Sequence, residues 1–261
     1  MRILRWSTLL LQGSLFFAYA AVASEGSLTD NQRISSAQLG YDLQYRTYRP
    51  SESFPNENLS SLYVTDGQWY LEPGGLKAVL DRLISTGRIK PVVVVFLDSR
   101  NPDKLTENRR NSQFMCSTQF AAFFANELIP TISRKQPVSL SRDDRVILGM
   151  SFGGLNSACF GLMLSNLFAG IAMQSPASGD HVDIVRDLYA QKEALPLKMF
   201  LSVGTKNDNQ AAVNRFRRVL ESKSYDLTFT TVREGHNWRN WGPLLDDVLV
   251  TFFSRHEGNE E

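Results

Sequence analysis

Short apolar runs that alternate with amphipathic segments are the feature that most constrains the fold of this chain. The runs span residues 41–48, 62–65, 92–97, 146–149, 171–174, 199–203 and 227–232. Most are β-branched and apolar at successive positions, as parallel strands buried on both faces must be. Strands that alternate with helical segments build βαβ units. The sequence therefore predicts an α/β fold with a mostly parallel central sheet and helices on both faces.

Helical periodicity is clear between these runs. Hydrophobic residues recur at positions i, i+3, i+4, i+7 and i+8 over residues 76–84, and residues 241–252 repeat the pattern. Further helices are expected at 120–132, 154–164 and 211–222. Residues 178–196 are the least regular and indicate a small lid or excursion. No repeat or linker interrupts the sequence, so one domain over residues 24–261 is expected.

Composition excludes several classes of function. Hydrophobic residues make up 43% of the 261 positions, which suits a globular domain with a sizeable core. The 28 Lys and Arg residues nearly balance the 27 Asp and Glu residues and form no basic stripe, so nucleic acid is not an expected partner. Cys116 and Cys159 have no Cys or His at metal-ligand spacing, and neither a metal nor another cofactor is expected. Both cysteines have apolar neighbours, which favours buried thiols, although an oxidising compartment would permit a bridge.

The N-terminus has the layout of a secretory signal. Arg2 and Arg5 precede an apolar stretch over residues 8–22, and Ala21 and Ala23 are the small residues of a cleavage site before Ser24. The stretch is shorter than the roughly 20 apolar residues of a spanning helix. Residues 1–23 are therefore expected to be removed, leaving a periplasmic or secreted protein without a stable membrane span.

A nucleophile motif stands between a predicted strand and a predicted helix. Residues 149–153 read Gly-Met-Ser-Phe-Gly, which matches G-x-S-x-G. A sharp strand-to-helix turn strains the central residue and brings backbone segments together, so glycines must flank it. The hydroxyl of Ser151 would then project from the carboxyl edge of the sheet. This context favours a nucleophilic serine over a glycine-rich turn with an incidental serine.

A base and an orienting acid are expected in loops at the same edge. Of the three histidines, His236 follows the last strand by a short turn, whereas His181 lies in the irregular segment and His256 in the charged tail. His236 is therefore the predicted base. Asp208 follows the strand at 199–203 and is the predicted acid. Asp180, Asp183 and a Ser-His pair supported by water remain open alternatives.

The oxyanion formed during attack on a carbonyl needs two donors. The backbone amide of Phe152, the residue after the nucleophile, is one. The second is expected in the loop after residues 62–65, at Gly67 or Gln68, where glycine permits close backbone approach; an ordinary Asp-Gly turn is the alternative. Loops at this edge also supply Trp69, Arg100 and Trp238, a set that suits an aromatic or polyoxygenated anionic acyl group. The alternative is that these rings only pack against the bases of the loops and that Arg100 is a solvated surface charge.

The motifs together resemble the branch of the α/β-hydrolases that contains esterase D, enterochelin (siderophore) esterases, feruloyl esterases and mycolyltransferases. The resemblance covers residues 41–253. The motifs that carry it are at 62–69, 127–130, 149–154, 174–176, 204–205, 235–238 and 241. It implies Ser151 as nucleophile, His236 as base and residues 67–68 near the oxyanion. The acid is less well matched. In the family, the acid usually follows the Gly-Thr pair more closely, by a residue or so, than Asp208 follows residues 204–205.

The resemblance implies a cofactor-free serine esterase that acts on a small-molecule ester, and the signal segment predicts that it is exported. A periplasmic esterase for siderophore trilactones of the enterobactin type fits the signal segment. Acyl transfer to another hydroxyl, or hydrolysis of feruloyl or acetyl groups on carbohydrate, are alternatives on the same fold. A binding module that has lost turnover is least favoured, because no residue of the Ser-His-Asp set is missing.

Export has a direct test. We expect mature protein recovered from the periplasm or medium to begin at Ser24 or within two residues of it, because a signal peptidase cleaves after small residues. N-terminal sequencing measures this. Recovery of a membrane-bound product that retains Met1 would instead identify the segment as an anchor.

Overall fold

A nine-stranded sheet forms the centre of the protein in the computed structural model, which describes residues 25–51 and 58–255. Its strand order is β1-β3-β5-β4-β8-β9-β10-β11, and β2 pairs with β3 beside β1. The strands are β1 (Ser27–Leu28), β2 (Gln32–Ser36), β3 (Tyr41–Arg49), β4 (Ser60–Thr65), β5 (Val92–Asp98), β8 (Arg145–Met150), β9 (Gly170–Gln174), β10 (Lys198–Gly204) and β11 (Asp226–Val232). The predicted signal segment and His256 lie outside the described residues.

Strands β4, β5, β8, β9, β10 and β11 are parallel, whereas the strands at the N-terminal edge pair in antiparallel fashion. Parallel pairing joins β5, β4, β8, β9, β10 and β11 in turn. Strand β3 runs antiparallel to β5, β1 and β2. All seven predicted strands are confirmed. Because the parallel strands share one direction, the loops after β4, β8, β10 and β11 all leave from the same edge of the sheet.

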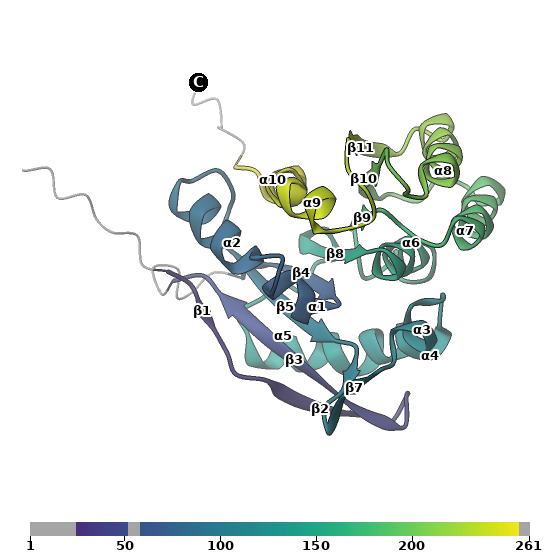
Figure 1. The fold of residues 1–261 in the computed structure, drawn as a ribbon. Coiled ribbons are helices and arrows are strands. Elements are labelled where there is room, and N and C mark those ends of the chain that lie inside the picture. Colours follow the sequence, from purple (N-terminus) through teal and green to yellow (C-terminus); the bar gives the residue numbers. More distant parts are fainter. Residues whose placement is uncertain (1–24, 52–57, 256–261) are drawn as a thin grey trace, which may run out of the picture.

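Helices cover both faces of this sheet, as predicted (Figure 1). Figure 1 shows α2 and α10 on one side and α4, α5 and α6 on the other. The helices are α1 (Gly67–Leu71), α2 (Leu76–Ser85), α3 (Arg110–Phe114), α4 (Thr118–Phe123), η1 (Phe124–Leu128), α5 (Ile129–Lys135), η2 (Arg142–Asp144), α6 (Phe152–Met163), α7 (Gly179–Gln191), α8 (Gln210–Ser222), α9 (Trp238–Trp241), η3 (Gly242–Leu244) and α10 (Leu245–Phe253).

Strand β5 shows why the predicted strands are apolar at successive positions. Val93 and Val95 belong to the hydrophobic cluster beneath α4, α5 and α6. Val92 and Val94 belong to a second cluster with α2 and α10. Successive side chains of a strand point to opposite faces, and both faces here are covered. The two-stranded hairpin of β6 (Arg100–Asn101) and β7 (Lys104–Asn108) stands outside the sheet and was not predicted.

The expectation of an irregular excursion at residues 178–196 is wrong, because α7 occupies most of it. Val182, Val185 and Tyr189 lie on one buried face of α7. The Tyr189 hydroxyl donates to the carbonyl oxygen of Ala158 in α6, at 2.9 Å. Polar residues and exposed apolar residues share the opposite face, which obscures the helical period in the sequence. Among the described residues, no helix has the length and apolar character needed to cross a membrane.

The expectation of buried thiols is also wrong, because Cys116 and Cys159 form a disulfide. Cys116 lies between α3 and α4, and Cys159 lies in α6, with 5.2 Å between the two Cα atoms. The two positions are 43 residues apart in sequence, so their proximity depends on how α3 and α4 pack against α6. The bond joins that packed unit to the helix that begins at Phe152.

We expect the double variant Cys116→Ser/Cys159→Ala to lose about 2–4 kcal/mol of unfolding free energy, because the bond restricts the unfolded chain. Urea titration followed by tryptophan fluorescence measures the loss. A thiol reductant should destabilise the natural protein to a similar extent and leave the double variant unchanged. Equal stability of the two proteins under oxidising conditions would contradict this role for the disulfide.

Candidate active site

Ser151 lies in the sharp turn between β8 and α6, where the sequence places it. Its backbone has φ 57° and ψ −123°, a conformation that residues other than glycine rarely adopt. The Ser151 amide donates to the Gln174 carbonyl at 2.9 Å, and the Ser151 carbonyl accepts from Leu155 at 3.0 Å. Hydrogen bonds on both sides therefore hold the strained residue in place.

Glycines make this turn possible. A Cβ atom at Gly149 would lie 2.2 Å from the backbone carbon of Gly153. A Cβ atom at Gly153 would lie 2.8 Å from the Thr65 hydroxyl oxygen. The predicted close approach of the backbone is therefore present, and it involves the end of β4 as well as the turn itself.

His236 and Asp208 face one another at the same edge. The His236 Nδ1 atom lies 2.8 Å from Asp208 Oδ1. Asp208 follows β10, and His236 follows β11, which pairs with β10. The His236 ring also meets the Trp241 ring edge to face, at 5.0 Å between centroids. The imidazole is thus fixed by a carboxylate on one side and an indole on the other.

The Asp208 carboxylate is fully buried and accepts several hydrogen bonds. Burial alone would raise the pKa of Asp208. Hydrogen bonds from His236, the Ser175 side chain and the Gly204 and Asn209 amides outweigh burial and hold that pKa below its usual value. The two amides lie 2.7 Å from the carboxylate oxygens. Asp208 is therefore ionised at neutral pH and can hold the Nδ1 proton of a neutral imidazole.

Asn240 joins this pair to the serine turn, and sequence reasoning missed it. Its Nδ2 atom lies 3.2 Å from Asp208 Oδ2 and 3.1 Å from the Ser175 hydroxyl. The Trp241 indole donates to the same hydroxyl at 3.0 Å. Ser175 follows Gln174, whose carbonyl binds the Ser151 amide. The sequence did contain a signal for it, because the amide side chain of Asn240 stands four residues after His236, the predicted base.

The alternative acids have other surroundings. Asp180 is exposed at the start of α7. Asp183 binds Arg215, with 2.9 Å between Asp183 Oδ1 and the arginine Nε, and it also pairs with Arg186. His181 Nδ1 is 2.8 Å from the Ser178 hydroxyl and has no carboxylate partner in the described part of the chain. The geometry thus favours Asp208 over both alternatives.

The two predicted donor segments are residues 67–68 and the backbone amide of Phe152. Gly67 begins α1, and Phe152 begins α6. The first amides of a helix have no acceptor within that helix, so these groups are available to an oxyanion. A Cβ atom at Gly67 would lie 2.5 Å from the backbone of Phe96. The glycine therefore permits close backbone approach, as predicted.

The three predicted substrate contacts have partners within the protein. Arg100 pairs with Asp98 through its Nη2 atom at 2.7 Å. Trp238 meets the Tyr70 ring edge to face at 5.4 Å. Trp69 lies beside Arg110, with 5.4 Å between the guanidinium carbon and the ring centroid. Arg110 was not predicted, because only the fold shows that its partner Asp66, the residue after β4, is buried and needs a cation nearby.

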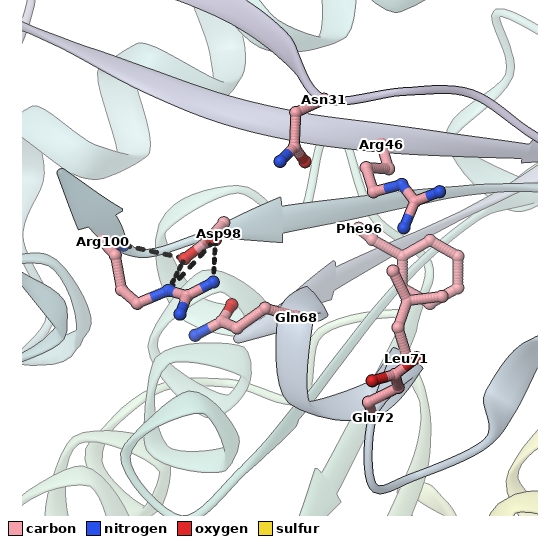
Figure 2. Close-up of a pocket in the computed structure, with 8 residues that line it drawn as sticks. All are labelled: Asn31, Arg46, Gln68, Leu71, Glu72, Phe96, Asp98 and Arg100. Atoms are coloured by element: carbon pink, nitrogen blue, oxygen red, sulfur yellow. Dashed lines mark hydrogen bonds and ion pairs between the residues drawn. The ribbon is translucent and has the colours of Figure 1, made fainter. Parts of the chain in front are cut away.

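A small polar pocket opens beside α1 (Figure 2). Its volume is about 200 Å³. Figure 2 shows the Arg100 guanidinium turned toward Asp98, with the Gln68 side chain beside it. The residues that line it are Asn31, Arg46, Gln68, Leu71, Glu72, Phe96, Asp98 and Arg100. The pocket therefore shares Gln68 with the donor segment at residues 67–68.

Comparison with known proteins gives one family. The family model described as "Putative esterase" matches residues 36–252. The iron(III) enterobactin esterase of Dickeya dadantii is 25% identical over 203 residues, which cover 70% of this chain and 45% of the relative. The iron(III) enterobactin esterase of Escherichia coli K12 is 25% identical over 209 residues, covering 70% and 50%. The chain thus spans about half the length of these curated relatives.

Solved structures share the fold. The enterobactin esterase from Shigella flexneri, solved in the presence of enterobactin, superposes with a TM-score of 0.77 at 20% identity, covering 85% of this chain and 58% of that one. The ferulic acid esterase from Anaeromyces mucronatus, in complex with ferulic acid, gives 0.73 at 16% identity, covering 89% and 93%. The fold of this chain is therefore the α/β-hydrolase fold of these esterases.

The choice of acid can be tested by covalent labelling. We expect Asp208→Asn to slow labelling of Ser151 by a fluorophosphonate by about 10²- to 10⁴-fold, because the imidazole loses control of its tautomer. Mass spectrometry of the labelled peptide measures the rate. Asp183→Asn is the matched control, since it removes a carboxylate held by arginines, and should change the rate less than about threefold. The reverse ranking would assign the acid to α7.

Proposed function

The chain belongs to the "Putative esterase" family, and on that premise we propose that it is a serine esterase that hydrolyses carboxylic esters through an acyl-enzyme. One observation carries the proposal. A strained serine between β8 and α6 shares the carboxyl edge of the sheet with a histidine that lies 2.8 Å from a buried carboxylate. This combination supports nucleophilic catalysis by serine.

The proposed reaction has two halves. In the first, the Ser151 oxygen attacks the ester carbonyl, and His236 Nε2 takes the hydroxyl proton. Amides of residues 67–68 and Phe152 stabilise the oxyanion. The intermediate collapses, the ester C–O bond breaks, and His236 gives its proton to the leaving alcohol. In the second half, water attacks the acyl-enzyme by the same route, and the acid and free Ser151 are released.

Asp208 supports both halves. Its lowered pKa keeps it ionised, so it can hold the Nδ1 proton and leave Nε2 free to accept from the serine. When His236 becomes a cation, the carboxylate stabilises that charge. Asn240 holds the second carboxylate oxygen at 3.2 Å and so keeps the carboxylate oriented toward the ring.

We propose esters of aromatic or polyoxygenated anionic acids as substrates, with catecholate trilactones of the siderophore type as the leading class. Trp69 and Trp238 provide aromatic surfaces near the donor segment at residues 67–68. Arg100 lines the neighbouring polar pocket. Aromatic rings stack on such surfaces, and guanidinium groups bind anionic oxygens. The names of the curated relatives, enterobactin esterases, support the same class.

Feruloyl esters of carbohydrate are the second candidate. The ferulic acid esterase from Anaeromyces mucronatus is covered over 93% of its length, whereas the Shigella flexneri enterobactin esterase is covered over 58%. The likeness to this esterase, which is described in complex with ferulic acid, supports feruloyl esters as the second candidate. Acyl transfer to a hydroxyl acceptor would use the same acyl-enzyme, and an acceptor competition assay separates it from hydrolysis.

The proposed site of action is the periplasm or the medium. The disulfide between Cys116 and Cys159 supports this location, because such bonds persist in oxidising compartments. The sequence pattern of residues 1–23 supports it independently.

The substrate proposal predicts a ranking of esters. We expect kcat/KM to be higher for a catecholate trilactone than for a feruloyl ester, and lowest for nitrophenyl acetate, because rings and arginines contribute only with the first two substrates. Steady-state kinetics on the mature protein measure the three values. A kcat/KM for nitrophenyl acetate that exceeds the value for the trilactone by more than about tenfold, or about 1.4 kcal/mol, would contradict a siderophore substrate.

Ser151→Ala is the control for the same measurement. It should lower turnover of every ester by about 10⁴-fold or more while leaving the protein folded, because the hydroxyl contributes to chemistry rather than to packing. Circular dichroism checks the fold. Retention of more than a few per cent of natural turnover would show that another group is the nucleophile.

A further inference from the structure

Two donor segments that are distant in sequence must hold one oxyanion. Residues 67–68 follow β4, and Phe152, the second donor segment, begins α6 after β8. An oxyanion is stabilised only when its donors lie about 2.7–3.1 Å from it, so the spacing between the segments matters as much as either amide. The contacts that connect the two segments therefore bear directly on turnover.

Asp66 lies against both segments. It precedes Gly67, and its carbonyl accepts from the Trp69 amide at 2.9 Å, which closes the first turn of α1. Its carboxylate is fully buried, and Asp66 Oδ2 would lie 3.7 Å from a Cβ atom at Gly153 in the first turn of α6. Asp66 also has φ 55°, a left-handed conformation that must be stabilised by its surroundings.

Arg110 supplies those surroundings from a third element, α3. Its Nη2 and Nε atoms lie 2.6 and 3.1 Å from Asp66 Oδ2. Its guanidinium carbon lies 5.3 Å from the ring centroid of Phe152 and 5.4 Å from that of Trp69. Arg110 therefore contacts Asp66 and Trp69, which flank residues 67–68. It also contacts Phe152, the other donor.

We propose that Arg110 is a positioning residue that sets the spacing of the two oxyanion donor segments, through its ion pair with Asp66 and its contacts with the Trp69 and Phe152 rings. The inference rests on the proposed esterase function. Arg110 acts on the amides of residues 67–68 and Phe152 rather than on the substrate itself. Its removal should weaken binding of the tetrahedral oxyanion more than binding of the ground-state ester.

Electrostatics support the same role. Burial raises the pKa of the Asp66 carboxyl, and Arg110 and the Ser99 hydroxyl oppose that effect. Ser99 donates to Asp66 Oδ1 at 2.9 Å. Without Arg110, the fully buried carboxylate would have no cationic partner among the described residues, and the turn that carries Gly67 would relax. The ring contacts at Trp69 and Phe152 would be lost at the same time.

The test uses a neutral ester and a transition-state analogue. Nitrophenyl acetate reports kcat and KM without an anionic group. An arylboronic acid binds when the Ser151 oxygen forms a bond to boron and the serine proton passes to His236; the boronate that results is tetrahedral and anionic. We expect Arg110→Gln to lower kcat about 10- to 100-fold and to raise the boronate Ki by a similar factor, with KM changed less than about threefold.

Arg109→Gln is the matched control. Arg109 is as exposed as Arg110, at 18% of its side chain, and it also pairs with a carboxylate, that of Glu107 at 2.9 Å. It lies over the Tyr41 ring at 4.3 Å and contacts neither donor segment. Its kcat and boronate Ki should therefore stay within about twofold of the natural values.

A second variant keeps the test decisive if Arg110→Gln does not fold. Asp66→Asn/Arg110→Gln removes both charges, so no buried charge is left without a partner, and it should show the same parallel change in kcat and Ki. Unchanged kcat in either folded Arg110 variant would overturn the inference. A raised KM with unchanged kcat and Ki would also overturn it, because Arg110 would then bind the substrate. A natural protein that hydrolyses no ester and ignores the boronic acid would overturn the proposed function and this inference with it.

Discussion

Close backbone contact at the end of β8 is the constraint on which the candidate site depends. Gly149 and Gly153 nearly touch, and the Thr65 hydroxyl fills the space beside them. Larger residues at either glycine would push α6 away from the sheet. The same contact puts strain on Ser151 and aligns the first turn of α6 with the end of β4. The proposed nucleophile, Ser151, and the two proposed donor segments are therefore coupled through a few atoms in van der Waals contact.

Buried aspartates recur along this edge, and each has a different set of partners. Asp66 after β4 binds Arg110, Asp98 at the end of β5 binds Arg100, and Asp208 after β10 binds His236. A buried carboxylate is costly unless it is paired, so each one orders the loop that supplies its partner. The partners of Asp66 and Asp98 are guanidinium groups, whereas the partner of Asp208 is an imidazole. This difference distinguishes the proposed proton shuttle from the two aspartate–arginine pairs.

Sequence patterns were sufficient for the sheet and for the order of the site residues. Alternating apolar runs and the motif at residues 149–153 report backbone geometry that is local, and local geometry is what a single sequence records well. The same reasoning failed at α7 and at the disulfide. In α7 the buried face is narrow, so the period is weak. Cys116 and Cys159 are brought together by the packing of α3 and α4 against α6, which no spacing along the chain reports.

The sequence by itself determined an α/β-hydrolase fold, a strained serine turn and loops at one edge that carry Asp208 and His236. Only the tertiary structure decided which groups these side chains meet. It placed Asp208 against His236 and Asp183, an open alternative, against Arg215. It also paired Arg100 with Asp98 and brought Arg110 between the two donor segments. The physical reason is that strand order and glycine turns follow from short-range sterics. Partners of buried charges depend on packing between segments that are far apart in the chain.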